Sequence, residues 1–151
     1  MEGFMQLTLE ADYAVRIISA LCFEEGRADA KTISEKAFVS LRFSLKILRK
    51  LVAAGLVESF KGTQGGYVLS RDPSQINLRQ VIEAIEGTYY FSRCLSPDGI
   101  CNRGMSGVCC YQRAFGEISD MVRDKLESYN FADMVASSLE KERDELLELE
   151  A

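Results

Sequence analysis

The residues from Thr32 to Gly55 constrain the fold most, because they predict two helices joined by a very tight turn. The letters TISE, which end at Glu35, fit a capping box, in which two side chains satisfy each other's backbone donors at a helix start. We expect this first helix to be short and to end near Ala37. Ser40 can cap the second helix, and Gly55 has the conformational freedom needed just after a helix.

A β-hairpin is predicted directly after this pair of helices. Residues 56–60 (LVESF) and 67–70 (YVLS) each have the composition of a short strand. The letters KGTQGG stand between them and include three glycines, so the connecting loop is flexible and begins with the basic Lys61. Helix, turn, helix and hairpin follow one another in the order of a winged helix–turn–helix, in which the hairpin is the wing.

The second helix of the pair carries an apolar stripe and a basic stripe. Its predicted core face consists of Leu41, Leu45, Leu48 and Val52, which recur at helical spacing. The basic stripe repeats that spacing one residue later and consists of Arg42, Lys46 and Arg49, with Lys50 adjacent. Such a helix suits the major groove of DNA, because its leucines hold it to the domain while its cations reach phosphates and base edges.

Three further residues are candidates for DNA contacts. Ser40 and Phe43 flank the basic stripe near the N-terminus of its helix, where base edges are usually read. Lys61 at the tip of the hairpin suits a contact with a phosphate or with the minor groove. The alternative is an ordinary amphipathic helix with a solvated basic face, and the neighbouring turn and hairpin favour DNA binding over it.

The net charge of −5 is unevenly distributed along the chain. Residues 27–61 hold eight Lys/Arg and three Asp/Glu, a local net charge of +5, whereas residues 114–151 carry −7. A chain that is acidic overall can therefore still present a basic surface, and the basic segment coincides with the predicted helices and hairpin.

Further helices are predicted on both sides of this unit. They follow Thr8 as a cap, run from Asn77 to Gly87 and from Cys110 to Ser128, and extend over residues 131–151. The helix after Cys110 has one apolar side, formed by Ala114, Ile118, Met121, Val122 and Leu126. Cys22 lies on the apolar side of the first helix, where we expect it to be a small core residue.

The composition predicts a cytoplasmic protein without a membrane partner. The sequence has no run of about 18 apolar residues, which a membrane-spanning helix requires, and its start does not resemble a secretory signal. Structural disulfides are rare in the cytoplasm, so clustered cysteines there more often bind metal or serve redox chemistry. The chain has no histidine, which excludes Ser-His-Asp and Cys-His catalytic sets, and we expect no enzymatic activity.

Four of the five cysteines lie in the loop sequence CLSPDGICNRGMSGVCC, residues 94–110. Their spacing is Cys94-x6-Cys101-x7-Cys109, with Cys110 next to the third. Structural zinc sites usually use paired CxxC motifs, which are absent here, as is the CxxC of a thiol oxidoreductase. Three well-spaced thiols in a glycine-rich loop can instead hold an iron–sulfur cluster. Zinc, reversible disulfides or free redox thiols, and an incidental cysteine-rich loop are the alternatives.

Taken together, these segments resemble the Rrf2 family of winged-helix repressors. The resemblance covers residues 5–135 and rests on LTLEADYAVR (7–16), the helix pair up to Val57, KGTQGGYVLS (61–70), INLRQVIEAIEG (76–87) and the three spaced cysteines. It implies a homodimer, built largely by the long helix after the cysteine loop. It also implies a palindromic operator in double-stranded DNA, read by two winged domains.

In cluster-bearing members of this family the three loop thiols are iron ligands, which map onto Cys94, Cys101 and Cys109. IscR-like members add a histidine three residues after the third cysteine, where this chain has Gln112. NsrR-like members use an acidic residue of the first helix across the dimer, and Asp12 is the matching position here. The fourth ligand is therefore left open among Asp12, which we favour, Cys110, Gln112 and a small external molecule. Both [2Fe–2S] and [4Fe–4S] clusters remain candidates.

The expected fold class is mainly α with a small β-hairpin, a winged helix–turn–helix plus a long dimerisation helix. We divide the chain into the winged region (5–87), the cysteine loop (88–110), the dimerisation helix region (111–135) and an acidic tail (136–151). The expected function is transcriptional regulation that senses iron, oxygen or nitric oxide through a cluster and controls genes such as those for cluster assembly. The alternative is a metal-free thiol regulator that uses reversible disulfides; CymR-like members of the family lack the three cysteines.

Overall fold

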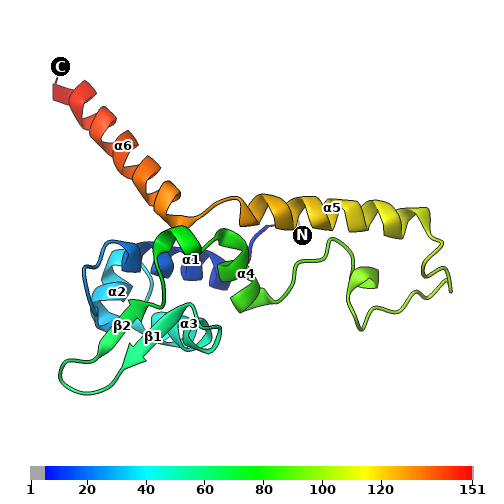
Figure 1. Cartoon of the computed structure of the whole chain (residues 1–151), viewed down its shortest axis with the longest axis horizontal. Helices are drawn as coiled ribbons and strands as arrows, with labels where there is room; N and C mark the ends of the chain where they lie inside the picture. Colours follow the sequence, from blue (N-terminus) through cyan, green and yellow to red (C-terminus); the bar gives the residue numbers. More distant parts are fainter. Residues whose placement is uncertain (1–5, 151) are drawn as a thin grey trace.

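The computed structural model describes residues 6–150, which are mainly helical with one small β-hairpin, as predicted (Figure 1). The elements are α1 (Leu9–Cys22), α2 (Ala30–Ala37), α3 (Leu41–Ala53), β1 (Val57–Phe60), β2 (Gly66–Leu69), η1 (Pro73–Gln75), α4 (Leu78–Glu86), η2 (Arg93–Leu95), α5 (Cys110–Glu127) and α6 (Phe131–Glu150). Residue 5 of the predicted winged region and residue 151 of the predicted tail lie outside the described residues. None of the described helices combines the length and the apolar character that a membrane crossing requires.

The hydrophobic core lies where α1 packs against α2, α3 and α4. Ile17 and Ile18 of α1 share this core with Ile47, Leu48 and Leu51 of α3, and none of the five side chains keeps any exposed area. Full burial of one such side chain contributes about 1.5–3 kcal/mol to folding. The winged domain therefore has a dry centre that fixes α3 relative to α1.

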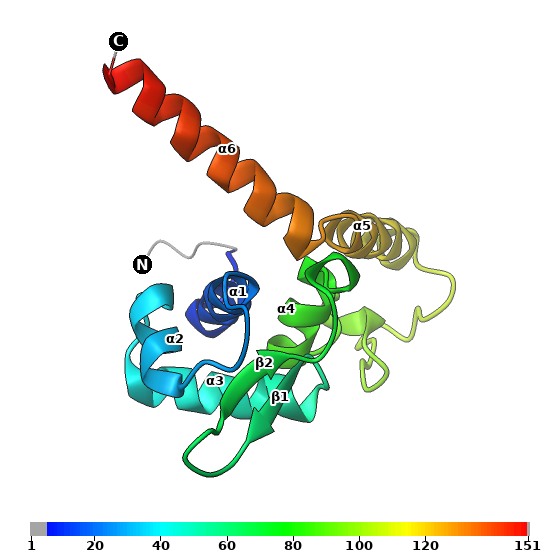
Figure 2. The same cartoon turned by 60° about the vertical axis from the view of Figure 1, so that its left-hand side comes forward.

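The first residue of α6 completes this core. Phe131 is 1% exposed and belongs to the same cluster, and its backbone N–H donates to the carbonyl of Ile76 at 2.9 Å. The N–H of Leu78 donates to the carbonyl of Tyr129 at 3.0 Å, so the two segments pair in antiparallel fashion. The start of α6 is thereby anchored to the winged domain, and the rest of the helix projects away from it (Figure 2).

The start of α2 differs from the prediction. The helix begins at Ala30, and the carboxylate of Asp29 accepts a hydrogen bond from the backbone N–H of Thr32 at 2.8 Å. The predicted capping box at Thr32 is therefore wrong, because Asp29 is an equally good cap one turn earlier and already satisfies the Thr32 donor. The predicted end of the helix at Ala37 and the cap of α3 by Ser40 are confirmed.

The turn between α2 and α3 contains a strained residue. Phe38 has φ +54° and ψ +44°, the left-handed conformation that L-residues rarely adopt. Its side chain is 86% exposed, so packing does not compensate for the strain. The backbone N–H of the next residue, Val39, donates to the carbonyl of Ser34 at 3.0 Å and closes the turn.

The predicted core face of α3 is wrong in part. The buried residues of this helix are Ser44, Ile47, Leu48 and Leu51. Of the predicted set, Leu48 is buried and Val52 packs partly against the core, but Leu41 is 45% exposed and Leu45 is half-buried outside the core. The sequence allows two overlapping apolar stripes, and the second one includes the small, fully buried Ser44.

The wing is an antiparallel hairpin that is tied to the segment before α2. Val57 pairs with Leu69 and Phe60 with Gly66, and Ala28 exchanges two backbone hydrogen bonds with Tyr67, at 2.8 and 3.0 Å. A Cβ atom at Gly66 would lie 2.7 Å from the carbonyl oxygen of Ala28, and the φ of this glycine is +139°. Only glycine fits this close approach, so Gly66 fixes the wing beside α2.

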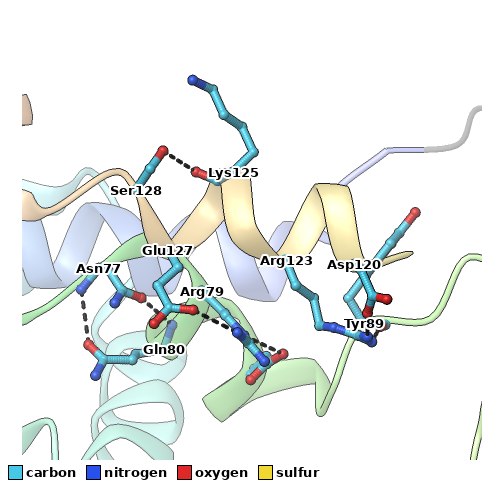
Figure 3. A network of polar contacts seen from close by, with 10 residues as sticks. Asn77, Arg79, Gln80, Tyr89, Asp120, Arg123, Lys125, Glu127 and Ser128 are labelled. Carbon is cyan, nitrogen blue, oxygen red and sulfur yellow. Dashed lines mark hydrogen bonds and ion pairs between the residues drawn. The ribbon is translucent and has the colours of Figure 1, made fainter. Parts of the chain in front are cut away.

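A polar network docks α5 onto the winged domain (Figure 3). The Arg79 guanidinium of α4 contacts Glu83 at 3.2 Å and Glu127 of α5 at 2.7 Å. Further along α5, Arg123 donates to the carbonyl of Tyr89 at 2.8 Å. Of the 18 residues of α5, only Ser119 is buried, so this helix leaves most of its surface free.

We expect Phe38→Gly to stabilise the protein. Relief of left-handed strain contributes about 1–2 kcal/mol, and the greater freedom of glycine in the unfolded chain offsets about 0.5–1 kcal/mol of it. The free energy of unfolding, measured by urea denaturation, should therefore rise by about 0.5–1 kcal/mol. Phe38→Ala is the control, because it keeps the Cβ atom and should bring no gain. A less stable glycine variant would contradict the strain.

Candidate DNA-binding surface and cysteine loop

The predicted basic residues of α3 lie in one exposed row. Arg42, Lys46 and Arg49 point away from the buried side that contains Ile47 and Leu51. They line a groove on the surface of α3 together with the apolar side chains of Leu41, Phe43 and Leu45. The structure thus confirms that the three cations are neighbours, and it adds Leu41 and Leu45, which the sequence analysis had placed in the core.

Lys50 lies differently from the other basic residues of α3. Its ammonium nitrogen is 2.7 Å from a carboxylate oxygen of Glu10 on α1, and that of Lys46 is 3.4 Å from the other oxygen. The hydrogen bond from Lys50, assisted by the charges of both lysines, lowers the pKa of the Glu10 carboxyl. Glu10 therefore holds α3 against α1, and its negative charge is shared by two of the cations predicted to face DNA.

The N-terminal end of α3 is fixed by two local contacts. The hydroxyl of Ser40 accepts a hydrogen bond from the backbone N–H of Phe43 at 3.4 Å. The ring of Phe43 packs edge-on against Tyr13 of α1, with ring centroids 6.1 Å apart, and the Phe43 side chain remains 47% exposed. Ser40 thus acts in the helix cap, while Phe43 contributes to the surface of the groove.

Arg27 supports the wing, a role that the sequence analysis missed. Its guanidinium stacks on the ring of Phe60 in β1, 3.5 Å from the ring centroid. The same group donates to the backbone carbonyl of Gln64 in the wing loop at 3.3 Å. Lys61, between these two contacts along the chain, is exposed. No local pattern reveals such a contact, because the partners are separated by 33 and 37 residues.

The part of the predicted cysteine loop that holds the four thiols, residues 94–110, lies alongside the N-terminal half of α5 and turns back into the start of that helix, away from the winged domain (Figure 1). All five cysteines are free thiols; Cys94, Cys101 and Cys109 are half-buried and Cys110 is exposed. Within residues 6–150, no three His, Cys, Asp or Glu side chains lie close enough together to hold a metal ion. The thiolate donor set fits an iron–sulfur cluster, and the loop must draw its sulfurs together to bind one.

The sulfur of Cys101 lies near backbone N–H groups of its own loop. Hydrogen bonds from the N–H groups of Met105 and Arg103 lower the pKa of the Cys101 thiol, and the Arg103 charge and the Gly104 N–H add to the effect. Backbone donors of this kind stabilise a thiolate, the form that binds metal and attacks oxidants. The sulfur of Cys94 is 3.3 Å from the hydroxyl of Ser92.

Gln112 joins the two ends of the cysteine loop. Its side-chain oxygen accepts from the backbone N–H of Gly107 at 2.9 Å, and its side-chain nitrogen donates to the carbonyl of Cys94 at 3.2 Å. Gln112 lies in the first turn of α5, so these bonds tie the loop to that helix. The amide is thus engaged with the backbone at the position where the family resemblance places a histidine ligand.

The remaining candidate ligands lie in separate environments. Asp12 forms an ion pair with Arg16 at 2.8 Å, and both side chains are more than two-fifths exposed. Cys110 is the first residue of α5 and directly follows Cys109. Burial raises the pKa of the Cys22 thiol to about 11, and the charge of Asp72 adds to this. Cys22 packs partly against the core, as predicted.

Comparison with known proteins shows the family to which this chain belongs. The profile of the Rrf2 family, described as an iron-dependent transcriptional regulator, matches residues 7–137. This chain belongs to the Rrf2 family. The HTH-type transcriptional regulator IscR of Photorhabdus laumondii is 32% identical over 133 residues, which are 87% of this chain and 79% of that relative.

Two solved structures are similar to this one. IscR of T. potens has 25% sequence identity and a TM-score of 0.69, over 89% of this chain and 88% of that one. CymR, the global cysteine regulator of B. subtilis, has 24% identity and a TM-score of 0.69, over 89% and 98%. The chain is therefore a DNA-binding transcriptional regulator of the Rrf2/IscR type, with a winged helix–turn–helix.

We expect Gln112→Ala to loosen the cysteine loop. The Gly107 amide would lose its acceptor, and a hydrogen bond worth about 1 kcal/mol corresponds to about fivefold faster amide hydrogen exchange. NMR-detected exchange of the Gly107 amide measures this effect. Ser96→Ala is the matched control, because Ser96 donates to the carbonyl of Arg93 in the same loop and does not touch Gly107. Equal exchange rates in the wild-type protein and Gln112→Ala would show that Gln112 does not order the loop.

Proposed function

We propose that this Rrf2 protein is a homodimeric regulator whose loop cysteines hold an iron–sulfur cluster and whose DNA affinity follows the state of that cluster. The observation that carries the proposal is the set of three half-buried free thiols, Cys94, Cys101 and Cys109, on one loop beside α5. Thiolates are the usual ligands of [2Fe–2S] and [4Fe–4S] clusters, and both types suit this donor set. The cluster would supply a centre sensitive to iron, oxygen or nitric oxide.

The fourth ligand in this proposal is the partner subunit's Asp12. Among residues 6–150 this carboxylate forms an exposed ion pair with Arg16, and such a pair is worth about 0–1 kcal/mol. Asp12 can therefore leave Arg16 at little cost in free energy. Cys110 is the second choice, because it directly follows Cys109 and two consecutive side chains do not easily face one small site. A small external molecule is the third.

The proposed dimer forms through α5. Met121 is 67% exposed and Tyr111 60% exposed, and Ile118 and Val122 are only half-buried in the single chain. An exposed apolar stripe of this kind marks an interaction surface. Because α5 is docked onto α4 through Arg79, a dimer built on α5 would hold two winged domains at a fixed spacing, as a palindromic operator requires.

DNA docking in this proposal places α3 in the major groove. The exposed cations Arg42, Lys46 and Arg49 face the groove, and Lys61 of the wing contacts a phosphate or the minor groove. Ser40 and Phe43 border the base edges at the start of α3. Lys50 contributes less than the other cations, because Glu10 already neutralises it. The proposed site of action is the cytoplasm, and the proposed targets include genes for iron–sulfur cluster assembly, by the resemblance to IscR-like members.

A metal-free thiol regulator is the second candidate function. The observation that favours it is the environment of Cys101, where backbone donors stabilise the thiolate that reversible disulfide formation requires. In that case DNA affinity would follow the oxidation state of the loop thiols rather than the state of a cluster.

The cluster proposal predicts that protein purified without oxygen contains iron and acid-labile sulfide. Cys94→Ala, Cys101→Ala and Cys109→Ala should each abolish both, whereas Cys22→Ala should change neither. Asp12→Ala should speed cluster loss more than Cys110→Ala, because a carboxylate is a weaker ligand than a thiolate and its iron is the most exchangeable. Colourless protein that gains disulfides on oxidation would favour the thiol regulator instead.

The docking proposal predicts different effects for different cations. Arg42→Ala should cost about 1–3 kcal/mol of operator binding and relax one base position, because the arginine fork can pair with guanine O6 and N7. Arg49→Ala and Lys61→Ala should weaken all duplexes alike and reduce the salt slope by about one ion each. Lys46 can serve in either way. Lys50→Ala should reduce DNA affinity least of these variants.

Binding of each variant to an operator and to a scrambled duplex, over a salt series, measures these effects. An unchanged base preference in Arg42→Ala would reduce it to a backbone contact. Unchanged affinity in all of these variants would mean that this face of α3 does not touch DNA.

A further inference from the structure

Two leucines of α3, Leu41 and Leu45, lie outside the hydrophobic core. Leu41 is 45% exposed and Leu45 is half-buried, yet neither belongs to the hydrophobic core or to the partly buried residues that pack against it. They are four residues apart and therefore lie on the same side of the helix, one turn from each other. A single exposed leucine needs no explanation, but this leucine pair lies within the groove that the basic row lines.

The position of Leu45 is the more specific of the two. It is three residues after Arg42 and four residues before Arg49, so it lies between these two cations on the helix surface. A polar or charged side chain there would read base donors and acceptors or phosphates. A leucine has no hydrogen-bonding group, so its only favourable contact in a major groove is with another apolar group.

The major groove offers one such group. Thymine carries a 5-methyl group beside its O4 acceptor on its major-groove edge, whereas guanine, adenine and cytosine have no methyl group there and present hydrogen-bond donors or acceptors. A leucine that covers those polar groups would leave them without partners, which is unfavourable. Apolar side chains therefore discriminate in favour of thymine.

We infer that Leu41 and Leu45 read thymine methyl groups beside the base that Arg42 contacts. The inference rests on the proposed docking of α3 and extends it, because it assigns a base identity to the apolar part of the groove. The three cations argue for DNA as the occupant. A second copy of the same face would bring like charges together, and DNA brings phosphates to Arg42, Lys46 and Arg49.

Replacement of thymine by uracil tests the inference, because it removes only the methyl group. Duplexes are first selected from a random pool by the wild-type protein as purified without oxygen, and each thymine of the selected half-site is then replaced in turn. We expect one or two positions at which uracil lowers wild-type affinity about fourfold, the effect of one methyl group transferred out of water. Leu45→Ala or Leu41→Ala should abolish the uracil effect at its own position.

Two controls separate this contact from general weakening. Leu45→Met keeps an apolar side chain and should retain the uracil effect. Arg49→Ala should weaken both duplexes alike and also retain it. The inference is overturned if no uracil position matters, or if the uracil effect persists undiminished in both alanine variants. A protein that selects no duplex at all would overturn the proposed DNA docking and this inference together, whereas selection without a uracil effect would overturn this inference alone.

Discussion

A short antiparallel contact between residues 76–78 and 129–131 positions α5, the cysteine loop and the start of α6 relative to the winged domain. Two backbone hydrogen bonds and the buried ring of Phe131 bring the chain back to the domain after a long excursion. The contact fixes the C-terminal end of α5, and the ion pair between Arg79 and Glu127 reinforces it one turn away. Because a helix is stiff over 18 residues, its other end and the attached cysteine loop are placed as well.

A few contacts also position the basic surface of α3 and the wing. Glu10 joins α1 to two lysines of α3, and Arg27 joins the segment before α2 to the wing. In these contacts Lys46, Lys50 and Arg27 bind groups of the protein itself. The neighbouring cations Arg42, Arg49 and Lys61 remain exposed to solvent. The basic surface is therefore divided between residues that shape it and residues that remain free.

Local signals in the sequence predicted the elements well. Thr8 and Ser40 were identified as caps, and Gly55 and Gly87 as helix ends, because these preferences depend only on neighbouring residues. The core face of α3 was misassigned because the helix itself carries leucine, isoleucine and valine residues around much of its circumference. Only the neighbouring elements decide which of two overlapping stripes is buried.

The site was predictable only in its residue types. The spacing of the cysteines and of the basic row could be recognised in the sequence. The hydrogen bonds of Gln112 could not, because they depend on the path of a loop. The contacts of Arg27 could not, because they join residues distant in sequence. Thr32 shows the limit on a smaller scale. Its motif fits a capping box, yet Asp29, one turn earlier, caps the helix and satisfies the Thr32 donor.

The direction of α6 gives the molecule an electrical polarity. This helix leaves the winged domain on the side away from the hairpin and α3, as both views show (Figure 1 and Figure 2). Residues 114–151 carry a net charge of −7, and residues 27–61 carry +5. The acidic C-terminal part of the chain and the basic segment of the winged domain therefore form an electric dipole. In the field of a polyanion such a molecule experiences a torque that turns its basic end forward before any contact is made, so that fewer collisions occur in unproductive orientations.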